Sequence, residues 1–177
     1  KMRRIIATEA AGKRFLNLFC YTASATVMAA LHGASSSLSC DLSNTYIEWA
    51  RRNFHLNKLA TNRHQLLNVD CMEWLRTQPK DLEYFDVILL DPPTFSNSKK
   101  MSVSLDIQRD HETIIRAAAN RLAPKGTLFF SNNFRKFKLN HNLTDVYSVE
   151  DMRPETLDAD FQRNPRVHNT WRIKHKN

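Results

Sequence analysis

Short apolar runs alternate along this chain with longer stretches in which apolar residues recur every three or four positions. The short runs are typical of buried strands, and the longer stretches are typical of helices that bury one face. The pattern therefore predicts five strands, at Arg14–Phe19, 36–41, His64–Val69, Phe85–Leu90 and Thr127–Ser131.

The helices are predicted from their apolar faces and from the polar residues that precede them. Ser43 suits an N-terminal cap, because Ile47, Ala50 and Phe54 share one face of the helix that would follow. The other helices are expected over 2–11 and Ser24–Leu31, around Met72 and Leu75, and from Asp106 through a stripe of Ile107, Ile114, Ala118 and Leu122.

This alternation of strands and helices predicts an α/β fold built on a mostly parallel, doubly wound sheet. Two more strand candidates, roughly Asp145–Asp151 and Val167–Lys174, are separated by only a short segment, so we expect them to pair as an antiparallel hairpin at one edge. A polar loop is predicted between the fourth strand and Leu105. The chain is expected to form a single domain, 1–177, with a substantial core.

Composition is typical of a folded soluble protein, with 25% charged and 42% apolar residues. No apolar stretch approaches the ~18 residues of a membrane span, and none resembles a signal peptide. The three cysteines, Cys20, Cys40 and Cys71, have no paired spacing, so we expect reduced thiols in a cytoplasmic protein. The histidines are not at metal-ligand spacing, and no metal is predicted.

The net charge of +8 and the pI near 9.6 favour a nucleic acid partner, because basic side chains displace the counterions of phosphates. In the densest basic segment, 133–138, Arg135, Lys136 and Lys138 alternate with phenylalanines. Phosphate contact combined with base stacking needs this mixture. A solvated loop whose phenylalanines are buried explains the segment equally well.

Three predicted strands end at an aspartate, namely Asp41, Asp70 and Asp91. The carboxyl ends of parallel strands meet at one edge of a sheet, which is where open α/β folds bind ligands. Ala23 lies in the loop after the first predicted strand, and Asp41 follows it by 18 residues. This separation is near the ~20 residues expected before an acid that binds a ribose hydroxyl. The three acids together predict a site for an adenosine-containing cofactor. In this site Asp70 would accept a hydrogen bond from the adenine amino group.

The glycines help to choose between such cofactors. The chain has only Gly12, Gly33 and Gly126, and none of them lies in the loop after the first strand. A dinucleotide pyrophosphate needs the close backbone approach that glycines permit, whereas S-adenosylmethionine has no phosphate. The missing glycines therefore count against NAD more than against S-adenosylmethionine.

The segment from Phe85 to Ser98 is the most informative in the chain. Its apolar run ends at Asp91, and Pro92 stops the strand and keeps Asp91 out of a helix. Methyltransferases that act on planar bases use Asp-Pro-Pro followed by an aromatic residue, here Phe95. In that arrangement the carboxylate and a proline carbonyl accept hydrogen bonds from the base edge, and the ring stacks on the base. An ordinary strand-ending turn is the alternative.

Six segments carry a resemblance to a known family, namely Phe15–Thr26, Asp91–Lys99, Gln108–His111, Phe130–Asn133, Asp160–Asn164 and Val167–Trp171. They resemble the bacterial bifunctional 23S ribosomal RNA large-subunit guanine methyltransferases, in their C-terminal guanine-N7 module. The likeness covers nearly the whole chain. It implies a Rossmann-like methyltransferase fold with a seven-stranded sheet, S-adenosylmethionine as cofactor and 23S ribosomal RNA as partner.

The resemblance also implies roles for residues, which together with the strand-end argument form three groups. The catalytic group is Asp91, Pro92, Pro93 and Phe95. The cofactor-binding group is Asn17, Phe19, Tyr21, Thr22, Ala23, Ser24, Asp41, Leu42, Asp70, Cys71 and Asp91. The RNA-binding group is Asn97, Lys99, Arg109, Asn132, Asn133, Arg135, Lys136 and Lys138.

The chain departs from the family pattern in two places. Ala23 stands where the family usually has glycine, which is expected to weaken cofactor binding. The family's segment before this domain, with an Asp and an Arg that help to close the cofactor site, is not part of the sequence. We therefore expect an excised part of a longer protein, whose N-terminal portion would bind RNA and carry a second methyltransferase.

The residue types also bear on the reaction. Methylation of a pyrimidine C5 requires a cysteine nucleophile, and related enzymes carry it after the fifth strand, where this chain has Ser131, Asn132 and Asn133. Guanine N7 has a lone pair and no proton to remove, so alignment supplies most of the catalysis. The alternatives are an exocyclic amino group such as guanine N2, a non-catalytic RNA-binding module, and a small-molecule methyltransferase.

Overall fold

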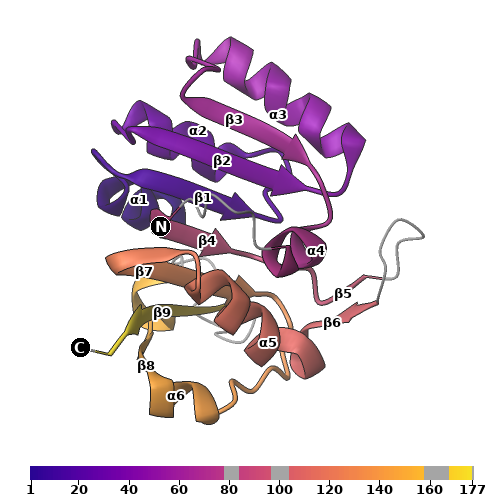
Figure 1. The fold of residues 1–177 in the computed structure, drawn as a ribbon, viewed down its shortest axis with the longest axis vertical. Coiled ribbons are helices and arrows are strands. Elements are labelled where there is room, and N and C mark those ends of the chain that lie inside the picture. Colours follow the sequence, from indigo (N-terminus) through magenta and orange to yellow (C-terminus); the bar gives the residue numbers. More distant parts are fainter. Residues whose placement is uncertain (78–83, 97–103, 158–167, 177) are drawn as a thin grey trace.

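The computed structural model describes residues 1–77, 84–96, 104–157 and 168–176 (Figure 1). Its main feature is a seven-stranded sheet in the order β3-β2-β1-β4-β7-β9-β8. The first five strands of this order are parallel, and β9 is antiparallel to both β7 and β8. The strands are β1 Arg14–Leu18, β2 Ser36–Asp41, β3 His64–Asn68, β4 Phe85–Leu90, β7 Leu122–Asn132, β8 Tyr147–Asp151 and β9 Asn169–His175.

The order of the strands confirms the predicted α/β fold and its antiparallel C-terminal hairpin. It adds that the last strand, β9, lies inside the sheet and that β8 forms the edge. The helices between and beside the strands are α1 Met2–Glu9, α2 Ser24–Leu31, α3 Asn44–Leu56, α4 Cys71–Arg76, α5 Ile107–Ala119, α6 Asn142–Val146 and α7 Arg153–Thr156.

The sheet buries both faces because its central strands carry apolar residues at successive positions. Phe15, Val87 and Phe129 pack with α1 and α2 on one face. Leu16 and Ile88 belong to the larger core on the other face, where α4 and α5 lie. Successive side chains of a strand point to opposite faces, so an uninterrupted apolar run supports two helical layers. This layering leaves the carboxyl ends of the parallel strands as the open edge.

At three places the structure forms another kind of element than the one predicted. Leu122 belongs to β7 and not to the helix, because α5 ends at Ala119 and Leu122 pairs with Phe85. The β4–β7 register shifts after this pair, and a Cβ on Gly126 would lie 2.9 Å from the Ala123 carbonyl oxygen. Such close backbone approach at an irregular strand is a position for glycine.

The other two differences concern short elements. The predicted polar loop contains two paired strands, β5 Phe95–Ser96 and β6 Leu105–Asp106, which are antiparallel. The strand expected from Asp145 begins at Tyr147, because the preceding residues form α6. In the part of the chain that the structure describes, no helix combines the length and the apolar character needed to cross a membrane.

Candidate functional site

A cavity of about 660 Å³ opens at the carboxyl ends of β1, β2, β3 and β4. This volume lies within the range of small-molecule sites. The cavity is lined by acidic, aromatic and small polar residues, and no lysine or arginine is among the described residues around it. The lining consists of Phe19, Tyr21, Asp41, Leu42, Ser43, Asn44, Thr45, Tyr46, Asp70, Cys71, Asp91, Pro92, Pro93, Ser96 and Asn133.

Asp41, the last residue of β2, connects two loops of the cavity wall. One carboxylate oxygen accepts a hydrogen bond of 2.9 Å from the Tyr21 backbone N–H, and the other accepts one of 2.9 Å from the Ser43 N–H. Burial raises the pKa of the Asp41 carboxyl, and the two N–H donors act against this rise. The side chain therefore stabilises the site's own walls and still faces the cavity.

The loop after β1 has an unusual backbone. Phe19, Tyr21 and Ala23 have φ values of 58°, 53° and 54°, which lie in the left-handed region. This conformation costs a residue with a Cβ about 1–2 kcal/mol relative to the right-handed helix region. The strain explains why glycine suits position 23, where this chain has a fully buried alanine.

Asp70 lies where β3 leads into α4 and caps that helix. Its Oδ1 accepts hydrogen bonds from the backbone N–H groups of Met72 at 2.9 Å and Glu73 at 3.4 Å. The next residue, Cys71, lines the cavity but is almost fully buried, and burial raises the pKa of its thiol to about 12. Burial also raises the pKa values of Cys20 and Cys40. All three thiols are therefore protonated, and none is a ready nucleophile.

Asp91 lies at the tip of β4, where Leu90 pairs with Phe130 of β7. Its Oδ1 accepts a hydrogen bond of 2.5 Å from the Ser131 hydroxyl. The residue keeps an exposed surface toward the cavity, although protein atoms enclose its carboxyl on the remaining sides. This enclosure raises the pKa of Asp91, while the hydroxyl of Ser131 and the nearby His168 lower it.

His168 extends the polar contacts behind Asp91. Its Nε2 lies 2.6 Å from the Thr170 hydroxyl, and its Nδ1 lies 3.4 Å from Oδ1 of Asn133. Sequence reasoning missed Ser131 and His168, because the register of β7 against β4 and β9 brings them to Asp91. It also missed the residues of the first turn of α3 that line the cavity, although Ser43 as the cap already indicated where that turn begins.

The predicted cofactor residues divide into those that line the cavity and those that do not. The lining includes Phe19, Tyr21, Asp41, Leu42, Asp70, Cys71 and Asp91. It does not include Asn17, Thr22, Ala23 or Ser24.

The remaining predicted cofactor residues make other contacts, and their part in cofactor binding stays a prediction. Asn17 is buried, and its amide donates to the Thr26 hydroxyl at 2.9 Å. The Thr22 carbonyl accepts from Asn53, and the Ser24 hydroxyl accepts from an arginine of α1. These residues hold the loop and α2 in place rather than face the cavity.

The predicted catalytic residues lie together, with one exception. Asp91, Pro92 and Pro93 line the cavity, whereas Phe95 lies outside the lining with 57% of its surface exposed. Pro93 and Ser96 belong to the lining, so Phe95 is close in sequence to residues of the cavity but does not line it.

The predicted RNA-binding residues differ in whether the structure describes them and in whether they are exposed. Asn97 and Lys99 lie outside the described residues. Asn132 is fully buried, and its Oδ1 accepts from the Phe134 N–H and from the Asn169 amide, so it is not available to RNA. Asn133, in contrast, is exposed and lines the cavity.

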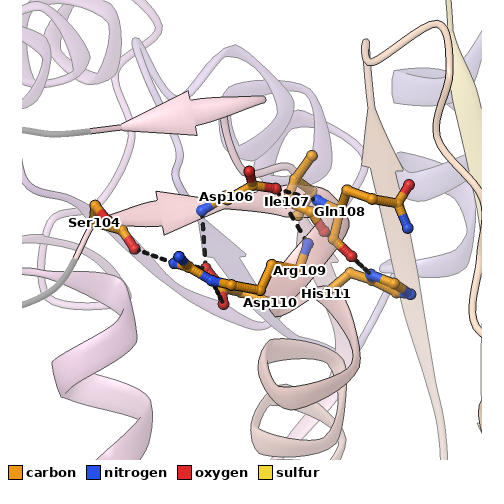
Figure 2. A network of polar contacts seen from close by, with 7 residues as sticks. All are labelled: Ser104, Asp106, Ile107, Gln108, Arg109, Asp110 and His111. Carbon is orange, nitrogen blue, oxygen red and sulfur yellow. Dashed lines mark hydrogen bonds and ion pairs between the residues drawn. The ribbon is translucent and has the colours of Figure 1, made fainter.

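Arg109 belongs to a network at the start of α5 (Figure 2). Its guanidinium contacts both carboxylate oxygens of Asp110, at 2.7 and 2.8 Å, and donates to the Ser104 carbonyl at 2.7 Å. Asp106 caps the same helix through the N–H groups of Gln108 and Arg109, as its sequence position predicted. The Arg109 side chain thus has an internal partner, and its predicted contact with RNA stays a prediction.

The basic segment 133–138 resolves into two kinds of residue. Arg135, Lys136 and Lys138 are exposed. Phe134 and Phe137 are partly buried against the main core, where the Phe137 ring lies near those of Phe130 and Trp171. Of the two explanations of this segment, the loop with buried phenylalanines fits these rings better than base stacking does, while the exposed cations keep their predicted availability for phosphate.

The doubly wound sheet and the acidic cavity at its carboxyl edge define an enzyme of the class that binds an adenosine-containing ligand at strand ends. The family model of S-adenosylmethionine-dependent methyltransferases matches residues 1–146, and the chain belongs to this family. S-adenosylmethionine is thus its cofactor, as the missing glycines had indicated. Among the described residues, no group of three or more potential ligands is placed to hold a metal ion.

Curated relatives are similar along nearly the whole chain. A protein of Saccharophagus degradans named ribosomal RNA large subunit methyltransferase K/L is 54% identical over 98% of this chain. The Pseudomonas aeruginosa protein of the same name is 55% identical over 97% of the chain. The match covers 23% of each relative, so the chain spans about a quarter of their length.

Solved structures show the same fold. One, described as a methyltransferase and complexed with SAH, has a TM-score of 0.80 and 25% identity, over 98% of this chain and 48% of its own. The 16S rRNA N2 G1207 methyltransferase of Thermus thermophilus, solved with AdoMet and guanosine, has a TM-score of 0.68 and 18% identity. The latter match covers 99% of this chain and 41% of that enzyme.

The cavity suits S-adenosylmethionine by its chemistry. The cofactor has cationic sulfonium and ammonium groups, a ribose with hydroxyls, and no phosphate. The cavity offers the carboxylates of Asp41, Asp70 and Asp91 with no basic residue among the described lining, together with the aromatic rings of Phe19 and Tyr21. An acidic, partly apolar cavity attracts a cation with an adenine ring and repels a pyrophosphate.

Proposed function

We propose that this chain is one methyltransferase domain of a longer protein, and that it methylates a guanine of 23S ribosomal RNA, at N7. The observation that carries the proposal is the identity of about 54% to proteins named ribosomal RNA large subunit methyltransferase K/L. The net charge of +8 and the exposed cations Arg135, Lys136 and Lys138 support an RNA substrate. The rest of the longer protein would supply further RNA contacts and a second methyltransferase.

In this proposal the cavity residues hold the cofactor by its charge and its ring. Asp41 accepts from ribose hydroxyls, Asp70 accepts from the adenine amino group, and Phe19, Tyr21 and Leu42 provide apolar contact. When bound, S-adenosylmethionine supplies a methyl group on a positively charged sulfur. Asp91 also faces this cavity, which keeps a base that contacts Asp91 close to the cofactor.

Asp91 orients the base and removes no proton from it. Its carboxylate and the Pro92 carbonyl accept hydrogen bonds from the guanine N1–H and N2–H₂ edge. Ser131 holds one oxygen of that carboxylate at 2.5 Å, which fixes its plane. Asn133 lines the cavity and contacts the base from the side of β7, and Phe95 stacks on the base. Methylation of guanine N7 needs no proton acceptor. The main contribution of the chain to catalysis is therefore the alignment of the guanine with the cofactor.

Chemistry at a pyrimidine C5 fits the site poorly. It requires a thiolate that adds to the ring, but Cys20, Cys40 and Cys71 are buried with raised pKa values. Replacement of all three cysteines by alanine or serine should leave methyl transfer intact in a folded protein. A covalent RNA–protein adduct trapped on the wild-type chain would contradict the proposed mechanism.

Methylation of the guanine N2 amino group is the second candidate. The Asp-Pro-Pro sequence also suits amino groups, and the Thermus thermophilus neighbour is named for N2 methylation of a guanine in 16S rRNA. That enzyme shares the fold with this chain at 18% identity.

The test is a methyl-transfer assay on 23S ribosomal RNA transcribed in vitro, with this chain and with the full-length protein. Digested nucleosides are separated by chromatography and identified by mass spectrometry, since 7-methylguanosine carries a positive charge and N2-methylguanosine does not. We expect 7-methylguanosine. N2-methylguanosine would favour the second candidate, and binding of both RNA and S-adenosylmethionine by the full-length protein without transfer would indicate a non-catalytic RNA-binding module.

A further inference from the structure

A second cavity, of about 410 Å³, lies beside the basic segment and has the opposite charge to the first. We propose that it binds one backbone phosphate of the RNA, directly beside the nucleotide that enters the acidic cavity. The inference rests on the proposed function and adds a specific phosphate site to it. The described lining consists of Arg135, Lys136, Phe137, Lys138, Arg153 and Asn169.

The charges around this cavity favour an anion. Arg135, Lys136 and Lys138 are exposed and make no ion pair with any carboxylate that the structure describes. Arg153 contacts both carboxylate oxygens of Asp151, which leaves that pair neutral. No acidic side chain is among the described lining residues. The cavity therefore carries about three uncompensated positive charges, whereas three carboxylates line the cofactor cavity.

The backbone that presents these cations is held in place by α5. The Gln108 side chain forms two hydrogen bonds with the backbone of Lys138, donating to its carbonyl at 3.0 Å and accepting from its N–H at 2.9 Å. The Asn140 N–H donates to Nε2 of His111 at 3.0 Å, and its amide donates to Glu112 at 2.6 Å. Figure 2 shows Gln108 and His111 at the start of α5.

Phe137 anchors the same segment from within. Its ring lies 4.9 Å from that of His111 and 5.3 Å from that of Trp171, centroid to centroid. Phe137 packs against the core, and the backbone of its neighbour Lys138 is hydrogen-bonded to Gln108 of α5. This part of the backbone is therefore already ordered before RNA binds. A pre-organised cationic wall binds a phosphate with a smaller entropy cost than a mobile loop does.

Residues of the two linings are neighbours where β7 ends and β9 begins. Asn132 pairs with Asn169 in the ladder, and the Asn169 amide donates to Oδ1 of Asn132 at 3.1 Å and to the Phe134 carbonyl at 3.0 Å. Asn169 lines the basic cavity, while Asn133, next to Asn132, lines the acidic one. Paired strands lie about 5 Å apart, so these residues of the two linings lie close to one another at this end of the sheet.

This geometry suits base flipping. A base that leaves its stack rotates about its own backbone, so the phosphates beside it must be held while the base turns. Phosphate contacts fix register and base contacts specify the target. A phosphate in the basic cavity would place the neighbouring base at Asp91, and the acidic cavity itself would repel the backbone.

The experiment measures RNA affinity by fluorescence anisotropy with S-adenosylmethionine present. The probe is a short single-stranded RNA with one guanine among uridines, in which each phosphate in turn is replaced by a neutral methylphosphonate. The variant is Arg135→Gln with Lys136→Gln and Lys138→Gln. The matched control is Arg52→Gln with Lys58→Gln and Arg63→Gln, which removes three exposed charges outside both described linings.

For the wild-type chain, we expect one methylphosphonate beside the guanine to weaken binding several-fold more than the others do. The variant should bind the all-phosphate RNA at least about tenfold more weakly, lose this positional effect, and show a salt slope smaller by about 0.7, the value for one phosphate contact on a single strand. The control should keep the positional effect. An equal effect of every methylphosphonate on the wild-type chain, or loss of the positional effect in the control, would overturn the phosphate site.

Methyl transfer to 23S ribosomal RNA is assayed in parallel, so the two proposals fail separately. Methyl transfer without a positional phosphate effect contradicts the phosphate site but not the proposed function. A positional effect that disappears in the variant, together with no methyl transfer, supports the phosphate site and contradicts the proposed function. Unchanged affinity of the variant for S-adenosylmethionine shows that its fold is intact.

Discussion

The hydroxyl of Ser131 donates a hydrogen bond of 2.5 Å to Oδ1 of Asp91, across the pair of strands β4 and β7. This contact holds one oxygen of the carboxylate that faces the cavity. It also offsets part of the cost of placing a carboxylate where protein atoms surround it, since burial raises the pKa of Asp91 and the hydroxyl lowers it.

Ser131→Ala should therefore reduce methyl transfer more than it reduces cofactor binding. Loss of a hydrogen bond to a charged group is worth about 1.5–3 kcal/mol, which corresponds to a turnover about ten- to a hundredfold lower. Turnover at saturating RNA and the affinity for S-adenosylmethionine are measured separately. Ser131→Thr keeps the hydroxyl and should restore most of the activity. Wild-type turnover in the alanine variant would show that the contact has no part in the reaction.

Asp41→Ala should weaken the binding of S-adenosylmethionine by about 1.5–3 kcal/mol, because the ribose hydroxyls lose a charged acceptor. Asp41 also accepts from two backbone N–H groups, so some loss of stability is expected as well. Asp106→Ala is the matched control, since Asp106 also accepts from two backbone N–H groups and does not line the cavity. Calorimetry should find lower affinity in the first variant only; equal affinity in both would remove Asp41 from the cofactor site.

Ala23→Gly should be close to neutral for stability, unlike other alanine-to-glycine changes in the chain. Ala23 has a φ of 54°, so glycine relieves about 1–2 kcal/mol of strain. The loss of a buried methyl group, about 0.8 kcal/mol, and the freer unfolded chain, about 0.4–1 kcal/mol, act against this gain. Ala29→Gly, at a buried helical position of α2, should cost about 2 kcal/mol. Urea unfolding compares the two; equal losses would mean that the loop carries no strain at position 23.

Asp86→Asn should destabilise the chain at neutral pH and not at acid pH. The backbone N–H and guanidinium of Arg14 donate to this carboxylate and lower its pKa in the folded state. The stabilisation is present above the unfolded pKa of about 3.9 and is lost as the pH falls through the lower folded value. The pair is partly exposed, so a loss of about 1 kcal/mol is expected at pH ~7, with less in high salt. A difference from wild type that persists at pH ~2 would contradict the assignment to ionisation.

Local pattern alone predicted most of the fold. The strand Phe85–Leu90 and the helix Ser24–Leu31 have the predicted boundaries, and Ser43 and Asp106 cap the predicted helices. These features depend on neighbours close in the chain, such as apolar spacing and side chains that bond the first turn. The two-residue strands β5 and β6 were missed, because a strand that short is defined only by its partner.

Sequence likewise predicted some features of the candidate site and not others. The positions of Asp41, Asp70 and Asp91 at strand ends, and the choice of S-adenosylmethionine over a dinucleotide, followed from residue order and from the missing glycines. Asn17 and Asn132 are polar residues in the same motifs, yet both are buried within the fold. Sequence does not tell which way a polar side chain at a strand end points.

Tertiary structure decided which residues meet. It brought Ser131 to Asp91 through the β4–β7 register, turned Phe137 into the core, and left Arg135, Lys136 and Lys138 around a second cavity. Each of these outcomes depends on contacts between segments far apart in the chain, and the free energy of such contacts is set by packing against partners that no local pattern encodes. The sequence by itself determined the class of fold, the acidic strand ends and the basic charge, because these are properties of residue type and spacing.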